Sequence, residues 1–169
     1  LMRLRTVYYD VDKESWCVPL TKGHVALIDE DDVERVSKYN WYSMKGKHTH
    51  YGAVKFAELS TTLHRFILSA SKEQKVDHKN GDGLDNRKAN LRFCSYGQNN
   101  ANSRKVAKCS SVYKGVTFDD TASFKWKARL YKDGKQKVLG RFATEQEAAL
   151  AYNRAAVEVY GEFAKVNQL

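Results

Sequence analysis

An acid, a histidine and two spaced asparagines surround a glycine-containing turn between residues 76 and 100. Asp77 and His78 are adjacent, and Asn90 and Asn99 follow on the far side of the turn. Hydrolysis of a phosphodiester needs a deprotonated water in line with the scissile bond, and positive charge where the leaving oxygen becomes negative. One imidazole and one divalent cation supply both, and these four residues are the side chains such chemistry requires.

Each of the four residues has a distinct expected role. We expect His78 to act as general base, because an unperturbed imidazole titrates near ~6.5 and is mostly neutral at cellular pH. Asp77 is a hard oxygen ligand suited to Mg²⁺. Asn90 is expected to accept a hydrogen bond from the other ring nitrogen of His78, and Asn99 to be the second metal ligand. Neighbouring residues of a regular strand point to opposite faces of the sheet. Asp77 and His78 can therefore contact one phosphate only if the strand is irregular at this point or if the phosphate lies at the end of the strand.

The order Asp77-His78, Asn90 and Asn99, with Leu63-His64-Arg65 ahead of it, resembles the HNH, or ββα-metal, nucleases. The likeness is greatest to the phage and intron-encoded homing type. It implies that the histidine activates water, that the acid and the helix residue bind one ion per active site, and that the central asparagine orients the histidine. Because the helix position is asparagine rather than histidine, we expect Mg²⁺ or Mn²⁺ rather than zinc.

Other residues near the motif have two interpretations each. His64, Arg65 and Arg92 are candidate phosphate contacts, and the alternative is a solvated surface position. Three loop residues are expected to shape the loop through side-chain to backbone hydrogen bonds, and three further histidines to lie on the surface. The loop residues are Asp85, Asn86 and Arg87, and the histidines are His24, His48 and His50.

The composition favours a polyanionic partner. The 169-residue chain has 29 Lys and Arg against 20 Asp and Glu, a formal charge of +9. This excess suits phosphate contacts on double-stranded DNA; a merely solvated basic surface is the alternative.

No apolar run approaches the ~20 residues that span a bilayer, and no signal-peptide pattern opens the chain. We therefore expect a cytoplasmic protein acting on host or phage DNA, without a membrane and with no evident protein partner. Three unpaired cysteines suggest reduced thiols.

The elements that must position the motif indicate an α+β fold. Short β-rich runs separated by turns fill residues 6–54, interrupted by a helix that starts near residues 29–32 and carries Val33, Val36 and Tyr39. A second helix is expected after Ser60-Thr61-Thr62. From residue 76 the order is strand, wide loop, strand at 91–94 and a helix opened by Ser95. This order predicts a ββα-metal core after an N-terminal β-rich region.

Residues 112–169 have a different pattern. Three strands are expected at 113–118, 125–131 and 137–140, followed by a helix with a Thr144/Glu147 capping box that stops at Gly161. This predicts a three-stranded antiparallel sheet packed on one helix. The preceding stretch, 101–111, is polar and basic and predicts a linker, in which Arg104 and Lys105 either follow a DNA backbone or are solvated.

Residues 112–167 resemble the APETALA or ethylene-response-factor DNA-binding domain, whose exposed sheet face lies in the major groove. Strand alternation gives a compatible answer: with Trp126, Ala128 and Leu130 facing the helix, the open face is basic with an aromatic edge. The residues expected on that face are Lys125, Lys127, Arg129 and Tyr131. Lys114 falls where the plant domains carry a DNA-contacting arginine. Thr117, Arg129, Tyr131 and Gln136 depart from the plant pattern, so the plant target sequence is not carried over.

These observations predict three segments: a nuclease region at 1–100 with its motif at about 62–100, a linker at 101–111 and a DNA-binding module at 112–169. The expected function is that of a DNA endonuclease, and more specifically a site-directed homing enzyme of a mobile genetic element. Two alternatives stay open. One is a non-enzymatic, sequence-specific DNA-binding regulator, and the other is a restriction or toxin-like HNH nuclease.

Overall fold

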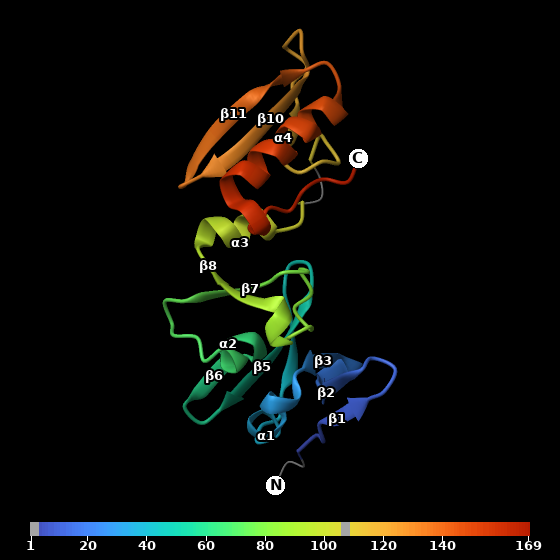
Figure 1. Cartoon of the computed structure of the whole chain (residues 1–169), viewed down its shortest axis with the longest axis vertical. Helices are drawn as coiled ribbons and strands as arrows, with labels where there is room; N and C mark the ends of the chain where they lie inside the picture. The colour runs from blue at the N-terminus through green and yellow to red at the C-terminus, as the bar shows by residue number, and fades with distance from the viewer. Residues whose placement is uncertain (1–3, 106–108) are drawn as a thin grey trace. The chain divides into compact units, whose positions relative to one another are not determined.

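A computed structural model describes residues 4–105 and 109–169. The chain forms two compact units, Leu1–Cys94 and Ser95–Leu169, which are described here one at a time. Both are mixed α/β units, in which small antiparallel sheets pack with a few helices (Figure 1). All three cysteines are free thiols. Within the described residues, no helix combines the length and the apolar character that crossing a bilayer requires.

The first unit contains three small antiparallel sheets. Their strands, in the order of pairing, are β1 (Tyr8–Asp10), β2 (Ser15–Pro19) and β3 (Val25–Ile28); β4 (Tyr42–Lys45), β5 (His50–Phe56) and β6 (Leu59–Thr62); and β7 (Lys75–His78) with β8 (Leu91–Cys94). The helices are α1 (Val33–Val36) and α2 (Leu63–Ile67), with 3₁₀ turns at Thr21–Gly23, Glu30–Asp32 and Lys88–Asn90. The β-rich N-terminal region and the strand pair of the motif were both predicted.

One core joins the three sheets of the first unit. Trp41 is 1% exposed at its centre, and Ile28 and Leu63 pack in the same cluster. The helix expected to include Tyr39 ends at Val36 instead. The indole N–H of Trp41 donates to the Val36 carbonyl at 2.9 Å, and this is a carbonyl that the next helical turn would have used. The same carbonyl accepts from the Tyr39 N–H at 3.3 Å, so a turn and the Trp41 contact replace the hydrogen bond that would continue the helix.

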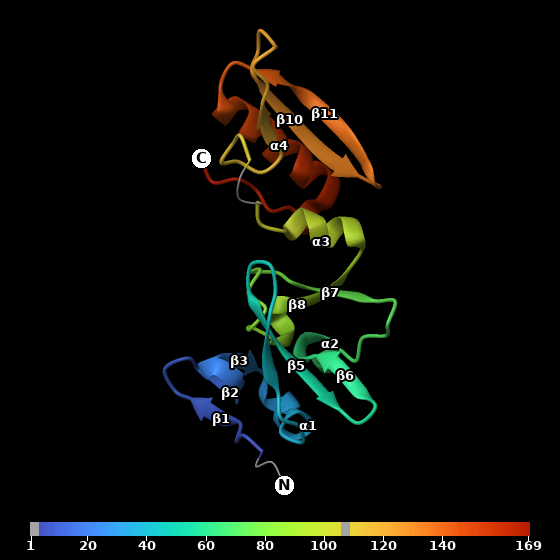
Figure 2. The same ribbon diagram turned by 180° about the vertical axis from the view of Figure 1, so that it is seen from behind.

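The second unit contains the predicted three-stranded sheet and long helix. Its elements are α3 (Tyr96–Asn102), β9 (Val116–Phe118), β10 (Trp126–Lys132), β11 (Lys135–Phe142), α4 (Glu145–Tyr160) and a 3₁₀ turn at Gly161–Phe163. The sheet order is β11-β10-β9, and all pairs are antiparallel. Figures 1 and 2 show α4 lying along one face of the sheet.

Alternation along β10 directs the apolar side chains toward α4. Ala128 is fully buried with Ala148 and Ala149 of α4, and Trp126 packs against this cluster as expected. The helix begins with the predicted capping box, because the Thr144 hydroxyl accepts from the Glu147 N–H at 3.2 Å and the Glu147 carboxylate accepts from the Thr144 N–H at 3.1 Å. The small alanines let the helix approach the sheet closely.

The helix α3 belongs to the second unit by its contacts. The Lys114 ammonium donates to the carbonyls of Asn100, Ala101 and Ser103 at 3.0, 2.5 and 2.7 Å, and the Lys165 N–H donates to Ala101 at 3.1 Å. A cation at a helix C-terminus satisfies carbonyls that have no intrahelical partner. The boundaries predicted at 100/101 and 111/112 stay predictions, and residues 106–108 of the expected linker lie outside the described residues.

Gly115 has a backbone conformation and surroundings that only glycine suits. Its φ is +76°, and a Cβ there would lie 2.0 Å from Cδ2 of the buried Tyr152. Gly115→Ala is therefore expected to destabilise the second unit by about 3 kcal/mol or more, through positive-φ strain and overpacking. Gly134→Ala is the matched control, because its φ is +73° and nothing lies within 4 Å of the added carbon. Its expected cost is about 1 kcal/mol.

The measurement is urea denaturation of the full chain, followed through NMR resonances of β10 residues so that the second unit is observed alone. Equal losses of stability in the two alanine variants would show that the contact with Tyr152 carries no cost.

Candidate active site

The strand pair β7–β8 positions the acid and the histidine of the motif. Asp77 pairs with Arg92 across the ribbon and His78 pairs with Leu91. Asp77 and His78 are 7% and 6% exposed. The strand ends at His78, and the chain turns at once because the Gly81 N–H donates to the His78 carbonyl at 2.9 Å. A histidine at the last position of a strand fits the expectation that any shared phosphate lies at the strand end.

The Asp77 carboxylate is held by the guanidinium of Arg92. Nε and Nη2 of Arg92 both lie 3.0 Å from Oδ2 of Asp77, and the side chain of Arg92 is 10% exposed. Arg92 was a candidate phosphate contact, and the structure shows it paired with the expected metal ligand. The two contacts fix the orientation of the Asp77 carboxylate. Loss of either partner would leave an uncompensated buried charge.

Asn86 fixes the proton on the His78 imidazole. Its Oδ1 lies 3.3 Å from Nε2 of His78, while its Nδ2 donates to the Leu84 carbonyl at 2.9 Å. That second bond determines which end of the amide faces the ring, so Nε2 of His78 carries the proton and donates it to Oδ1. The basic lone pair of the neutral ring is then on Nδ1.

Asn90 does not have the predicted contact with His78. Its Nδ2 donates to Oδ1 of Asn80 at 3.0 Å and to the Asp85 carbonyl at 2.8 Å, while its Oδ1 accepts from the Asn80 N–H at 3.1 Å. Asn90 closes the base of the loop through these bonds, and its predicted role in orienting the imidazole stays a prediction. Asn86, which was expected only to shape the loop, contacts the histidine.

The N-terminal sheet braces the loop that carries Asn86. The Leu27 N–H donates to the Leu84 carbonyl at 2.8 Å, and the Asn86 N–H donates back to the Leu27 carbonyl at 2.9 Å. The Lys88 N–H donates to the Asp29 carboxylate at 2.6 Å. Asn86 is fully buried as a result. The hydrogen bonds from the β-rich region therefore fix the position of the loop and keep Asn86 beside His78.

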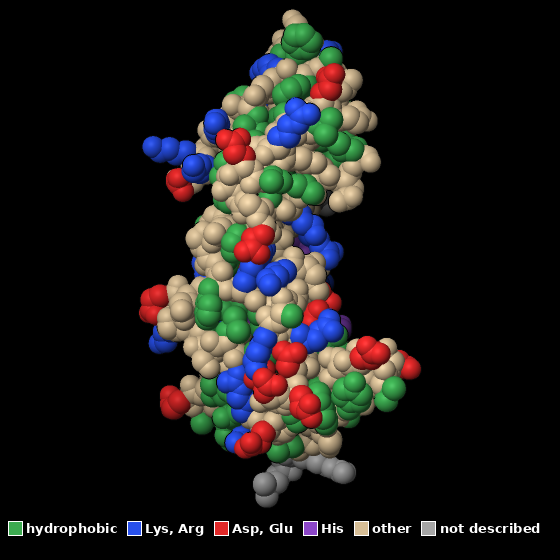
Figure 3. All heavy atoms as spheres, viewed as in Figure 1, with side chains coloured by type: hydrophobic (Ala, Val, Ile, Leu, Met, Phe, Trp, Pro, Cys, Tyr) green, Lys and Arg blue, Asp and Glu red, His purple; other side chains and the backbone are tan. Residues whose placement is uncertain are grey.

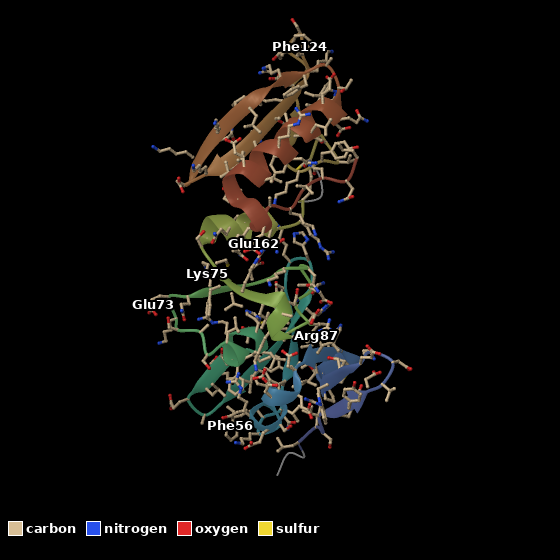
Figure 4. All side chains as sticks on the ribbon, in the orientation of Figure 1. Phe56, Glu73, Lys75, Arg87, Phe124 and Glu162 are labelled. Atoms are coloured by element: carbon tan, nitrogen blue, oxygen red, sulfur yellow. The ribbon has the colours of Figure 1, made fainter. Side chains whose placement is uncertain are left out.

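Charged side chains on the same loop form local ion pairs. The Arg87 guanidinium (Figure 4) pairs with the Asp85 carboxylate at 2.8 Å. The Arg87 N–H also donates to this carboxylate at 3.4 Å, which is a side-chain to backbone bond of the predicted kind. Lys88 pairs with Asp31 and Asp32 at 2.9 and 3.1 Å. Figure 3 shows basic and acidic side chains intermingled over one face of the first unit. Arg87 and Lys88 are therefore already paired with carboxylates of the same unit.

A second imidazole and a phenol ring line the other side of His78. The ring centroids of His64 and His78 are 4.8 Å apart in an edge-to-face arrangement, and Tyr51 lies 5.7 and 5.8 Å from the two rings. Gly83 leaves room for this group, because a Cβ there would lie 2.5 Å from the Tyr51 ring and from the His50 carbonyl. His64 is therefore part of the His78 environment and is no simple surface residue.

Burial keeps both imidazoles neutral. It lowers the pKa of His78 below the ordinary value, although the hydrogen bond to Asn86 and the nearby Asp77 act in the opposite direction. Burial also lowers the pKa of His64 to about 3, with His78 and Arg65 acting in the same direction. A general base must be unprotonated to accept a proton, so His78 is in the required state at neutral pH.

Three basic residues predicted as DNA contacts form local bonds, and their contacts with DNA stay predictions. Arg65 donates to the carbonyls of Ser71 and Gln74 and so holds the connection between α2 and β7. Lys105 donates to the Tyr113 carbonyl at 2.5 Å. Lys114 caps α3 as described above, and burial lowers the pKa of its ammonium to about 8.

The remaining predicted residues lie in both units. Among the other histidines, His48 is exposed, as expected, while His24 and His50 are half-buried and stack at 4.1 Å. Asn99 lies on α3 in the second unit, and its role as metal ligand stays a prediction. Arg104 is exposed.

The basic residues of the sheet differ in their partners. Lys125 pairs with Asp120 at 2.7 Å, while Lys127 lies on β10 two residues before Arg129. Arg129 and Tyr131 contact Gln136 across the β10–β11 hairpin.

Comparison with known proteins identifies the family. The chain is 34% identical over 154 residues to the uncharacterized HNH endonuclease L560 of Acanthamoeba polyphaga mimivirus, a match covering 88% of this chain and 77% of that protein. The chain therefore belongs to the HNH endonuclease family. No family model matches it, and no solved structure matches it.

A shorter likeness covers a third of the chain. Over 58 residues it is 45% identical to the AP2-like ethylene-responsive transcription factor TOE2 of Arabidopsis thaliana and 43% identical to the APETALA2-like protein 2 of Oryza sativa subsp. japonica. These matches span 12% and 13% of the plant proteins. The resemblance of residues 112–167 to this type of domain agrees with these matches.

Proposed function

We propose that the protein is a DNA endonuclease that hydrolyses a phosphodiester with one divalent cation and His78 as general base, directed to its sites by the sheet of the second unit. The observation that carries the proposal is the Asn86–His78 hydrogen bond. It holds a neutral imidazole at the end of β7 with Nε2 protonated and Nδ1 as the basic atom. The proposal is also supported by the mimivirus relative, whose name describes it as an HNH endonuclease.

In the proposed step, a water molecule adds to the phosphorus while Nδ1 of His78 takes its proton. The bond from phosphorus to the leaving deoxyribose oxygen breaks, and solvent protonates that oxygen. Asn86 accepts the Nε2–H throughout, which stabilises the imidazolium as it forms. His64 and Tyr51 pack on the ring and limit its rotation.

The donor chemistry fits a hard divalent cation. Asp77 would hold it through a carboxylate oxygen, and a bound cation would stabilise the charge on the leaving oxygen. Asn99, the second ligand expected from the sequence, lies on α3 of the second unit and stays a prediction. Across residues 4–105 and 109–169, no three His, Cys, Asp or Glu side chains gather as a complete metal cage. Mg²⁺ and Mn²⁺ are the expected ions, because Mg²⁺ commonly keeps several waters and uses few protein ligands.

The open face of the β9–β10–β11 sheet is the proposed DNA-binding surface. We expect the double variant Lys127→Ala with Arg129→Ala to weaken duplex binding and to lower the slope of log affinity against log salt by about 1 or more, because at least one phosphate-neutralising charge is lost with Lys127. Fluorescence anisotropy with a labelled duplex over a range of salt concentrations measures both. Lys72→Ala, which removes a charge outside the sheet, is the control. An unchanged slope in the double variant would remove this face from the proposal.

The test of the whole proposal is incubation of the purified protein with supercoiled plasmid, with Mg²⁺ or with a chelator, followed by mapping of the ends. A few fixed ends support a homing enzyme of phage or mobile-element type. Ends throughout the plasmid support a restriction or toxin-like nuclease. Intact plasmid under every divalent-metal condition, with retained duplex binding, supports a non-enzymatic DNA-binding regulator and contradicts the proposal.

A further inference from the structure

Three polar side chains form a connected group on the open face of the β10–β11 hairpin. Tyr131 lies directly opposite Gln136 in the antiparallel register. The Tyr131 hydroxyl donates to Oε1 of Gln136 at 2.9 Å, and Nη1 of Arg129 donates to the same oxygen at 3.3 Å. Tyr131 and Gln136 are exposed and Arg129 is half-buried. These contacts fix which end of the Gln136 amide faces outward.

The Gln136 carbonyl has no acceptor capacity left. An amide oxygen accepts two hydrogen bonds along its lone pairs, and Tyr131 and Arg129 supply both. The group therefore offers a ligand the two N–H donors of the Gln136 amide and the remaining donors of the Arg129 guanidinium. The amide of Gln136 and the guanidinium of Arg129 can therefore only donate hydrogen bonds to a ligand.

A surface that only donates distinguishes among the bases of the major groove. Glutamine ordinarily recognises adenine by donating to N7 and accepting from the N6 amino group, and acceptance is closed to Gln136. Cytosine presents an amino donor, and thymine presents one acceptor beside a methyl group. Guanine alone presents two adjacent acceptors, N7 and O6.

We propose that Arg129 and Gln136 form a donor-only pair that recognises guanine in the major groove, with Tyr131 as the positioning residue that keeps the Gln136 carbonyl occupied. This inference rests on the proposed DNA binding by the open face. It assigns a base preference to that face and does not involve the chemistry at His78.

The neighbouring charges on this face suit a position over a duplex. Lys127 lies two residues from Arg129 on the same side of β10, opposite Arg141 of β11. The Arg141 guanidinium is already paired with Asp119 at 2.6 Å, so Lys127 is the better candidate for a phosphate contact. A phosphate contact positions the sheet without selecting a sequence, and the donor pair then supplies the selection.

The experiment selects bound duplexes from a randomised library with the full chain, in chelator so that no cleavage occurs, and sequences them. The wild-type chain should enrich guanine at one position. Gln136→Ala should lower the preference for guanine over adenine there by about tenfold, since a good bidentate contact discriminates by that order. Tyr131→Phe should lower it as well by freeing the carbonyl, while pooled affinity stays within about twofold.

Lys127→Ala is the matched control on the same face, and it should weaken binding to all sequences alike. The phenyl ring of Tyr131→Phe keeps the hairpin contacts, and circular dichroism checks that each variant is folded. An enrichment without guanine, or a guanine preference unchanged in Gln136→Ala, would overturn the inference. Absence of duplex binding in chelator together with metal-dependent plasmid cleavage would also overturn it and leave the endonuclease proposal standing.

Discussion

His78→Ala is expected to lower the rate of metal-dependent plasmid cleavage by about 10²–10⁴-fold, the usual contribution of a general base. The imidazole is held at the end of β7 by Asn86 and by the rings of His64 and Tyr51. No water or neighbouring side chain takes its place as acceptor of the nucleophile's proton in the proposed mechanism. Duplex binding should be retained, because the proposed binding surface lies in the second unit.

The measurement compares first-order cleavage rates of supercoiled plasmid at saturating Mg²⁺, with binding measured separately in chelator. His48→Ala is the matched control, because His48 is an exposed histidine of the same unit. Its rate should equal that of the wild-type chain. Full cleavage by His78→Ala would assign the base to another residue and end the present mechanism.

Asn86→Ala is expected to lower the turnover rate by about 10–100-fold, by analogy with the loss of a residue that hydrogen-bonds a metal-ligating histidine. Without the carbonyl acceptor, the proton of the neutral ring moves freely between Nε2 and Nδ1, and the developing imidazolium loses a partner. Asn86→Asp keeps an oxygen acceptor beside Nε2 but loses the amide donor to the Leu84 carbonyl, so it should recover part of the rate at a lower stability. The effect should appear in turnover and leave the apparent affinity for DNA nearly unchanged.

Asn90→Ala provides the comparison that separates orientation from loop structure. Asn90 bonds to Asn80 and to the Asp85 carbonyl, so its loss should loosen the loop and lower thermal stability. Higher activity of Asn86→Asp than of Asn86→Ala, without a matching gain in stability, would support the orienting role of Asn86. A loss of activity in Asn86→Ala that followed melting temperature alone would contradict it.

Elements set by near neighbours in the chain were predictable. Ser95 opens α3 by accepting from the Gln98 N–H, and Thr144 with Glu147 caps α4, because these contacts join residues three apart. The strand pair carrying Asp77 and the three-stranded sheet also follow from local alternation and turn residues. Trp126 was assigned to the core by alternation alone, and it packs against the α4 cluster.

Contacts between distant segments were not predictable. Lys114 matches a DNA-contacting position of the plant domains, yet its ammonium is bonded to the carbonyls that end α3. Arg92 was equally open to phosphate or solvent, and it pairs with Asp77 through strand register. A long basic side chain has several carbonyls and carboxylates within reach, and charge alone does not select among them.

The sequence by itself determined the chemical inventory: an adjacent Asp77 and His78 before a glycine-containing loop, in a basic chain with a second sheet-and-helix module. Only the tertiary structure decided that Asn86 holds the imidazole while Asn90 closes the loop, and that Arg92 holds the carboxylate. The physical reason is that both asparagines lie in one loop at similar separations from His78. Which of them reaches the ring depends on the hydrogen bonds to Leu27 that brace the loop, 57 residues or more away in the chain.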